Sequence, residues 1–167
     1  PCAFRYPRGT GLGSTLPSIN EKIEIGKSKI IKEGKKLVIL NFGARLSETL
    51  KAAENLSKKG IPITVVDARF AKPLDENLIW QLATTHEAIM TIEEGSIGGF
   101  GSHVVNFLTK KGLMDSNLKF RSLTLPDIFI DQDTPDKMYK LANLDSVSIE
   151  EKVLDLLNSN IVLKKQK

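Results

Sequence analysis

The sequence predicts an α/β protein in which helices cover both faces of a mostly parallel sheet. Two observations lead to this prediction: short apolar runs alternate with amphipathic segments over residues 37–125, and glycines or prolines punctuate the turns between them. Strands that alternate with helices are joined by right-handed crossovers and therefore run parallel. With 167 residues the chain is long enough to bury the core of one such domain.

Composition excludes several classes of protein. Hydrophobic residues make up 41% and charged residues 26%, the mixture of a globular protein, and no apolar run is long enough to cross a bilayer, so we expect no membrane partner. The net charge is +4, but the aromatic residues lie inside apolar segments, which argues against nucleic-acid binding. Cys2 is the single cysteine, so no intrachain disulfide can form, and a reducing, cytoplasmic location is the expectation.

The first elements of the alternating block have clear signals. Residues 37–42 are almost wholly apolar, as in a strand that is covered on both faces, and Gly43 ends the run. Apolar residues then recur at helical spacing over 44–59, which ends in a basic turn and a glycine. Residues 61–66 form the next predicted strand.

The remainder of the block repeats the pattern. Asp75 is a suitable N-cap for an amphipathic helix, and residues 88–92 form a third apolar strand. The glycine-rich segment 95–101 then opens a helix that continues through Leu108. Residues 118–125 form a fourth strand, which is more polar and therefore predicted nearer an edge.

The flanking segments are less regular. Residues 24–31 resemble a polar edge strand, and the turn after them locally favours a hairpin with the strand at 37–42. After the block we expect a loop at 127–133 and two short helices, at 135–144 and 148–157.

The glycine-rich loop could in principle bind an anion, since a strand, a glycine turn and a helix N-terminus make such a site. The dinucleotide fingerprint fails, because Val104 stands where its third glycine is required. Glu93 and Glu94 precede the loop and would repel a phosphate. Glycines that allow close packing of helix and strand are therefore favoured over a phosphate cradle.

Other catalytic arrangements are weakly supported. Glu93 and Glu94 are adjacent on a strand and point to opposite faces, so they are unsuited to act as a paired acid and base, and one is expected to face a partner domain. His86 and His103 have no cysteine or carboxylate at ligand spacing, which predicts no metal site. His86 is assigned instead to a helix–strand turn and His103 to the helix opening.

The start of the chain contains two arginines around a Tyr-Pro pair. In Arg5-Tyr6-Pro7-Arg8-Gly9 the guanidinium groups could bind phosphate or carboxylate in a bidentate manner, and the glycine lets the backbone turn close by. A surface turn whose arginines pair with nearby acids is an equally good interpretation. Spacing alone leaves both open.

Four segments resemble the C-terminal part of the 1-deoxy-D-xylulose-5-phosphate synthase family. They are Arg5-Tyr6-Pro7-Arg8-Gly9, Asp67-Ala68-Arg69-Phe70-Ala71-Lys72-Pro73-Leu74-Asp75, Thr91-Ile92-Glu93-Glu94-Gly95 with Gly98-Gly99-Phe100-Gly101, and Leu125-Pro126-Asp127-Ile128-Phe129-Ile130. The Glu-Glu-Gly segment with its glycine turn is shared with transketolases and with the β subunits of 2-oxo acid dehydrogenases. The first and last segments narrow the resemblance to the synthase.

The resemblance implies a homodimeric transferase of non-mevalonate isoprenoid biosynthesis that depends on thiamine diphosphate and magnesium. Such enzymes condense pyruvate with glyceraldehyde 3-phosphate and release CO2, and their cofactor lies between the first two of three domains. The chain is similar to the third domain with the last strand of the second. The resemblance thus implies a strand at 1–9, a linker at 10–20, a transketolase C-terminal-like domain at 21–158 and a frayed tail at 159–167. The missing N-terminal domains would be its partners, and the fragment by itself is expected to bind no cofactor and to be inactive.

The resemblance also assigns residues and strand order. Arg8 matches the ligand of the aldehyde's phosphate, and Arg5 and Tyr6 shape the strand end. A domain or dimer interface is implied for five residues: Glu93, Glu94, Gly98, Gly99 and Phe100. The family's sheet is a three-layer α/β/α arrangement of five strands, mixed and mostly parallel, with the first strand antiparallel at the edge beside the third. This order conflicts with the local hairpin and is preferred to it.

Two alternatives remain open at this point. The chain could be the C-terminal domain of a 2-oxo acid dehydrogenase E1 β subunit, which would associate with a separate α chain. It could also be a stand-alone interaction module. The reading frame upstream of Pro1 would distinguish the three.

Overall fold

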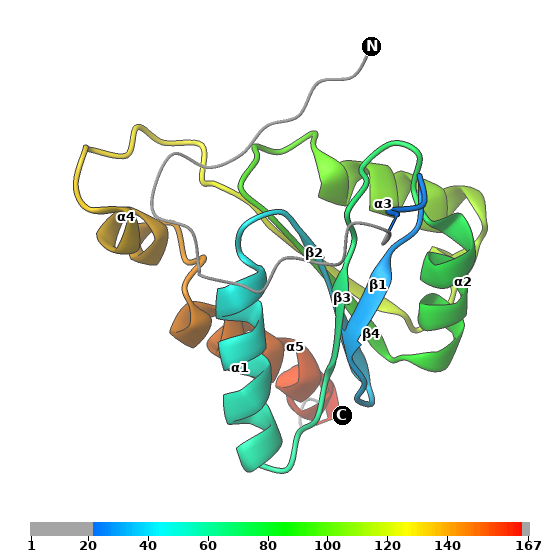
Figure 1. Cartoon of the computed structure of the whole chain (residues 1–167). Helices are drawn as coiled ribbons and strands as arrows, with labels where there is room; N and C mark the ends of the chain where they lie inside the picture. Colours follow the sequence, from blue (N-terminus) through cyan, green and yellow to red (C-terminus); the bar gives the residue numbers. More distant parts are fainter. Residues whose placement is uncertain (1–21, 165–167) are drawn as a thin grey trace.

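The computed structural model describes residues 22–164, and a five-stranded sheet with helices on both faces forms its centre (Figure 1). The strands are β1 (Lys29–Lys32), β2 (Leu37–Phe42), β3 (Thr64–Asp67), β4 (Ala88–Glu93) and β5 (Lys119–Leu123). Their order is β1-β3-β2-β4-β5; β1 is antiparallel to β3, and all other pairs are parallel. The predicted fold class is confirmed, including the antiparallel first strand beside the third.

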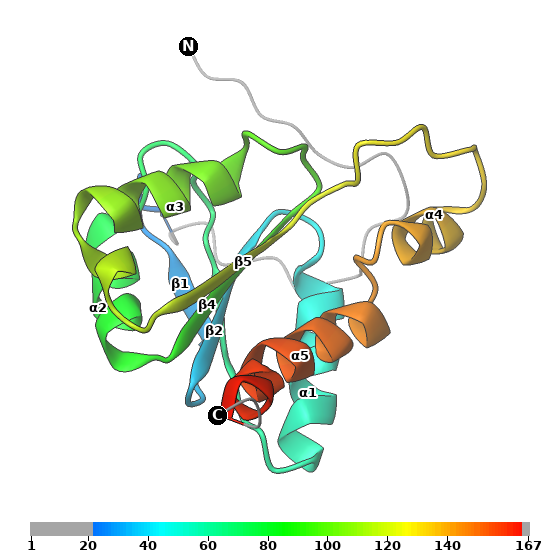
Figure 2. The same ribbon diagram turned by 180° about the vertical axis from the view of Figure 1, so that it is seen from behind.

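Two layers of helix enclose the sheet. The helices are α1 (Leu46–Lys58), α2 (Glu76–Thr85), α3 (Phe100–Lys110), α4 (Pro135–Leu141) and α5 (Ser146–Lys164), with a short 3-10 turn, η1 (Leu113–Asp115). α1 and α5 cover one face, and α2 and α3 cover the other (Figure 2). No helix of residues 22–164 is both long and apolar enough to span a bilayer.

The alternation of side chains along β2 builds both halves of the core. Leu37 and Ile39 pack toward α1 and α5, whereas Val38 and Leu40 pack toward α2 and α3. All four side chains are at most 1% exposed. A central parallel strand that is buried on both faces must be apolar throughout, which explains why the sequence pattern identified it.

The local hairpin expected over residues 24–42 is wrong, because β3 lies between β1 and β2. The turn between these strands packs on the segment that leads into β3: Lys35 donates its N–H to the carbonyl of Pro62, and Gly34 donates to Thr64 Oγ1. A Cβ on Gly34 would lie 2.2 Å from the carbonyl carbon of Ile63, so only glycine allows this approach. The close contact directs β1 to the far side of β3.

The segments after β5 differ modestly from prediction. α4 ends at Leu141 rather than at residue 144, and α5 runs from Ser146 to Lys164, beyond the predicted 148–157. The carboxylate of Glu48 in α1 accepts the N–H of Ser146 and so anchors the start of α5. β5 is partly exposed along its length, as predicted for an edge strand.

Candidate functional site

The candidate site is the edge of the sheet at which the four parallel strands end. In open α/β sheets ligands and partners commonly bind outside the carboxyl ends of the strands. The segments that follow β2, β4 and β5 meet here, and α4 lies at the same edge (Figure 1). Both the glycine-rich loop and the 125–130 segment belong to this edge.

Glu93, the last residue of β4, fixes the start of α3. Its Oε2 accepts the N–H of Phe100 and its Oε1 accepts the N–H of Gly101, each at 2.9 Å. Glu93 is only 4% exposed, and both amides belong to the first turn of α3, whose N–H groups have no partner within the helix. The carboxylate therefore caps the helix and complements the positive end of its dipole.

The glycines of this loop are required by that cap and by the strand beneath it. A Cβ on Gly99 would lie 2.2 Å from Glu93 Oε2, and a Cβ on Gly101 would lie 2.4 Å from the Oγ of Ser122 in β5. A side chain at either position would therefore force the Glu93 carboxylate or the Ser122 hydroxyl to move. The interpretation as packing residues is confirmed for Gly99 and Gly101, whereas a Cβ on Gly98 would meet nothing within 4 Å.

The loop is consequently not an anion site. A phosphate at the start of α3 would need the amides of Phe100 and Gly101, and the buried carboxylate of Glu93 already holds both. Among residues 22–164 no group of three or more His, Cys, Asp or Glu is placed to hold a metal ion. The N-terminus of α3 is therefore not available to the diphosphate of a cofactor.

Glu94, the next residue, points elsewhere and joins three elements. Its Oε1 lies 2.7 Å from Nε of Arg45, the residue that precedes α1. The Arg45 guanidinium in turn lies 3.5 Å above the ring centre of Tyr139 in α4. Burial raises the pKa of Tyr139, and the nearby Glu94 carboxylate raises it further. The ion pair and the cation–π contact together link α4 to the sheet edge.

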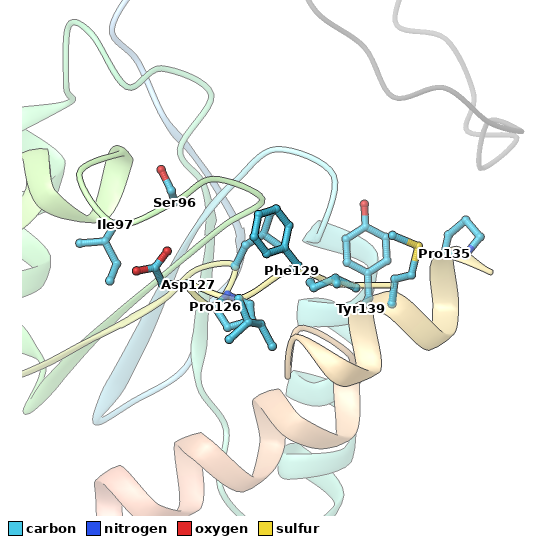
Figure 3. Close-up of a pocket in the computed structure, with 11 residues that line it drawn as sticks. Ser96, Ile97, Pro126, Asp127, Phe129, Pro135 and Tyr139 are labelled. Carbon is cyan, nitrogen blue, oxygen red and sulfur yellow. The ribbon is translucent and has the colours of Figure 1, made fainter. Parts of the chain in front are cut away.

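An apolar groove of about 850 Å³ lies next to this cluster. It is bounded by the Ser96–Ile97 turn, the 125–130 segment and one side of α4, and the Phe129 ring stands between Ile97 and Tyr139 (Figure 3). We call it the edge groove; its lining residues are Ser96, Ile97, Leu125, Pro126, Asp127, Ile128, Phe129, Ile130, Pro135, Met138 and Tyr139. Asp127 is its one charged residue, so the groove is not suited to bind an anionic substrate.

The structure separates the residues that the sequence singled out. Glu93 and Phe100 have internal roles, being 4% and 2% exposed, rather than forming an open surface. Glu94 and Gly99 are partly exposed and Gly98 is exposed, so an interface role for these three stays a prediction. Arg8, with Arg5 and Tyr6, lies outside the described residues.

The two histidines are not brought into a common site. His86 directly follows α2, as predicted, with its Nε2 2.8 Å from Thr64 Oγ1, and burial lowers its pKa. His103 lies in the first turns of α3, also as predicted. Each histidine therefore belongs to a helix end of the fold, His86 to the end of α2 and His103 to the start of α3.

Sequence reasoning missed Arg45 and Tyr139. Both come from segments that are polar or irregular in sequence, and they meet only because α1 and α4 approach the same sheet edge. An available signal was Glu94 itself, because a partly buried carboxylate requires a cation or hydrogen-bond donors nearby.

Comparisons with known proteins agree with this architecture. Residues 26–149 match the model of the family described as transketolase, C-terminal domain. A solved structure described as a split gene transketolase, inactive beta4 tetramer, is similar with a TM-score of 0.76 and 28% sequence identity; the match covers 87% of this chain and 46% of that chain. The chain thus spans about half the length of that relative. With its five-stranded mixed sheet and this match over most of its length, the chain belongs to the transketolase C-terminal domain family.

Proposed function

We propose that the chain is the C-terminal domain of a 1-deoxy-D-xylulose-5-phosphate synthase. Such a transferase uses thiamine diphosphate and magnesium to condense pyruvate with glyceraldehyde 3-phosphate and releases CO2. The proposal depends on two findings taken together: the family match over residues 26–149 and, before it in the sequence, the synthase-like segment Arg5-Tyr6-Pro7-Arg8-Gly9. The segment Leu125-Pro126-Asp127-Ile128-Phe129-Ile130, which lines the edge groove, adds support.

The cofactor site is assigned to domains that precede this one in the same enzyme. Two features support this assignment: the match covers 46% of the relative's chain, and Glu93 already occupies the amides at the start of α3. In this proposal residues 1–9 complete the preceding domain, and two copies of the enzyme form a homodimer in the cytoplasm. The present domain then supports the catalytic domains and performs no bond-making step.

The test is the reaction of the full-length enzyme. Incubated with pyruvate, glyceraldehyde 3-phosphate, thiamine diphosphate and magnesium, it should form 1-deoxy-D-xylulose 5-phosphate and one equivalent of CO2. Transfer of a two-carbon unit between sugar phosphates without CO2 release would instead indicate a transketolase. Pyruvate oxidation that requires a lipoyl acceptor and a separate α chain would indicate the 2-oxo acid dehydrogenase alternative.

Arg8 offers a second test, specific for the aldehyde substrate. A bidentate charged contact to phosphate is worth about 2–3 kcal/mol, so Arg8→Ala should lower kcat/KM for glyceraldehyde 3-phosphate by roughly 30- to 150-fold. The kcat/KM for pyruvate, and the use of unphosphorylated glyceraldehyde, should change far less. Equal losses for the phosphorylated and unphosphorylated aldehydes would contradict the phosphate-binding role.

A further inference from the structure

We propose that the edge groove is the docking surface for the domain that precedes this one in the same polypeptide. The proposal rests on the proposed function in one respect only, namely that the chain is part of a longer enzyme. It does not depend on which reaction that enzyme catalyses.

Three of the exposed large apolar side chains of residues 22–164 line the edge groove. Phe129 is 104% exposed, so its ring makes almost no contact with the rest of the described chain, and Ile97 and Ile128 are 80% and 61% exposed. Single exposed apolar residues are ordinary, but three large ones around one apolar depression mark an interaction surface. Figure 3 shows the Phe129 ring projecting between Ile97 and Tyr139.

The polar groups of the groove specify the chemistry of the partner. Asp127 makes no hydrogen bond or ion pair with any side chain or amide of residues 22–164, whereas the nearby Glu94 is neutralised by Arg45. The occupant should therefore present aliphatic or aromatic side chains to Phe129 and a Lys or Arg to Asp127. Such a mixture is typical of the surface between two protein domains.

The path of the chain brings the preceding domain to this edge. β1 is antiparallel to its neighbour, so residues 22–28 approach the sheet at the edge where the parallel strands end. Two bonds fix them there: Ser28 donates its N–H to Asp75 and its hydroxyl to the carbonyl of Ala68. Three strand spacings, about 14 Å, separate β1 from β4 and the groove, a distance that a folded domain easily spans.

The similar transketolase chain is long enough to include a preceding domain that could cover the groove. The matched family is described as a C-terminal domain, and the proposed function places further domains before it in the same polypeptide. More than half of the similar transketolase chain lies outside the match, because the match covers only 46% of it. We therefore favour the preceding domain as the occupant over a second copy of the enzyme, because it joins this domain at the sheet edge where the groove lies.

Photo-crosslinking in the full-length enzyme tests this assignment. Phe129 is replaced by p-benzoylphenylalanine, which retains an aromatic side chain and so does not perturb folding at an exposed position. The matched control carries the same group in place of Trp80, which is 51% exposed on α2, on the opposite face of the sheet. After irradiation the products are separated under denaturing conditions and mapped by mass spectrometry.

We expect the probe at position 129 to join, within one chain, to peptides from upstream of Pro1, at a yield about tenfold above the probe at position 80. Crosslinked products of doubled mass would overturn the proposal, because they would show a contact between two copies of the enzyme. A yield equal to that of the control would also overturn it, because the groove would then be open to solvent. A native polypeptide no longer than this chain would also overturn it. Activity of the same preparation tests the proposed function separately, because a transketolase or dehydrogenase would still give the intrachain crosslink.

Discussion

Glu93 and Glu94 are neighbours in sequence at the end of β4, yet they belong to two very different regions of one sheet edge. Glu93 is turned inward, and each oxygen of its carboxylate accepts one amide N–H of α3. Glu94 is turned toward α4, where it pairs with Arg45 beside the edge groove. One region is closed, tightly packed and internally satisfied; the other is apolar and open.

The difference shows which part of the edge remains available to a partner. Glycines bring the first turn of α3 close to β4 and β5, and Glu93 already holds the amides that a phosphate would need. Around the groove the large apolar side chains face outward, and the polar cluster only fixes the wall behind them. Binding of a partner should therefore depend on the edge groove, and the stability of the domain should depend on the Glu93 cap of α3.

The largest effect is expected from Glu93→Ala, which leaves two buried amides without an acceptor. Loss of a charged acceptor to buried donors costs about 3 kcal/mol of the free energy of unfolding, measured by urea denaturation. Glu94→Ala is the matched control and should cost less than about 1 kcal/mol, because its ion pair is partly exposed. Equal losses would mean that the two carboxylates do not differ as described.

Gly99→Ala should be next, at about 2 kcal/mol, because its methyl group would strike the Glu93 carboxylate. The decisive measurement is the double mutant. In the Glu93→Ala background the cost of Gly99→Ala should fall below about 0.5 kcal/mol, since the obstructing group is gone. Additive losses would show that Gly99 serves some purpose other than making room for the cap.

A smaller effect is expected from the titration of Tyr139. Because burial and Glu94 raise its pKa in the folded state, the unfolded chain loses the phenolic proton first, and stability should fall as pH rises above about 10. The tyrosinate absorbance of Tyr6→Phe reports Tyr139 alone, as the chain has 2 tyrosines. Adding Glu94→Gln should bring the pKa back toward its ordinary value, and an unchanged titration would argue against the contact.

The smallest effect on stability is expected from Phe129→Ser. A fully exposed ring contributes little to folding, so the free energy of unfolding should change by less than about 0.5 kcal/mol. Binding of a hydrophobic dye such as ANS should nevertheless decrease, because the substitution removes the most exposed apolar group of the groove. A loss of stability above about 1 kcal/mol would show that the ring packs within the domain.

Elements whose identity depends on local apolar pattern were predictable from sequence. β2 has the predicted bounds, 37–42, because a doubly covered strand must be apolar at every position. Asp75 was correctly predicted as an N-cap, and its carboxylate accepts the N–H of Leu78. In these cases residues within one turn or strand contain the whole signal.

Features that depend on distant contacts were not predictable from pattern. The neighbour of β1 is decided by the approach of Gly34 to Ile63, which no local hairpin rule includes. The cap of α3 comes from Glu93 across a loop rather than from the residue at the N-cap, which is a glycine. Resemblance to a family gave the correct strand order where local reasoning did not.

In the proposed function this domain supports an enzyme whose cofactor is bound by other domains. Calorimetry of the 167-residue chain with thiamine diphosphate and magnesium tests it most directly. We expect no saturable heat of binding, because Glu93 holds the amides that a diphosphate would need. Saturable binding with a micromolar Kd would contradict both the domain assignment and the description of the α3 N-terminus.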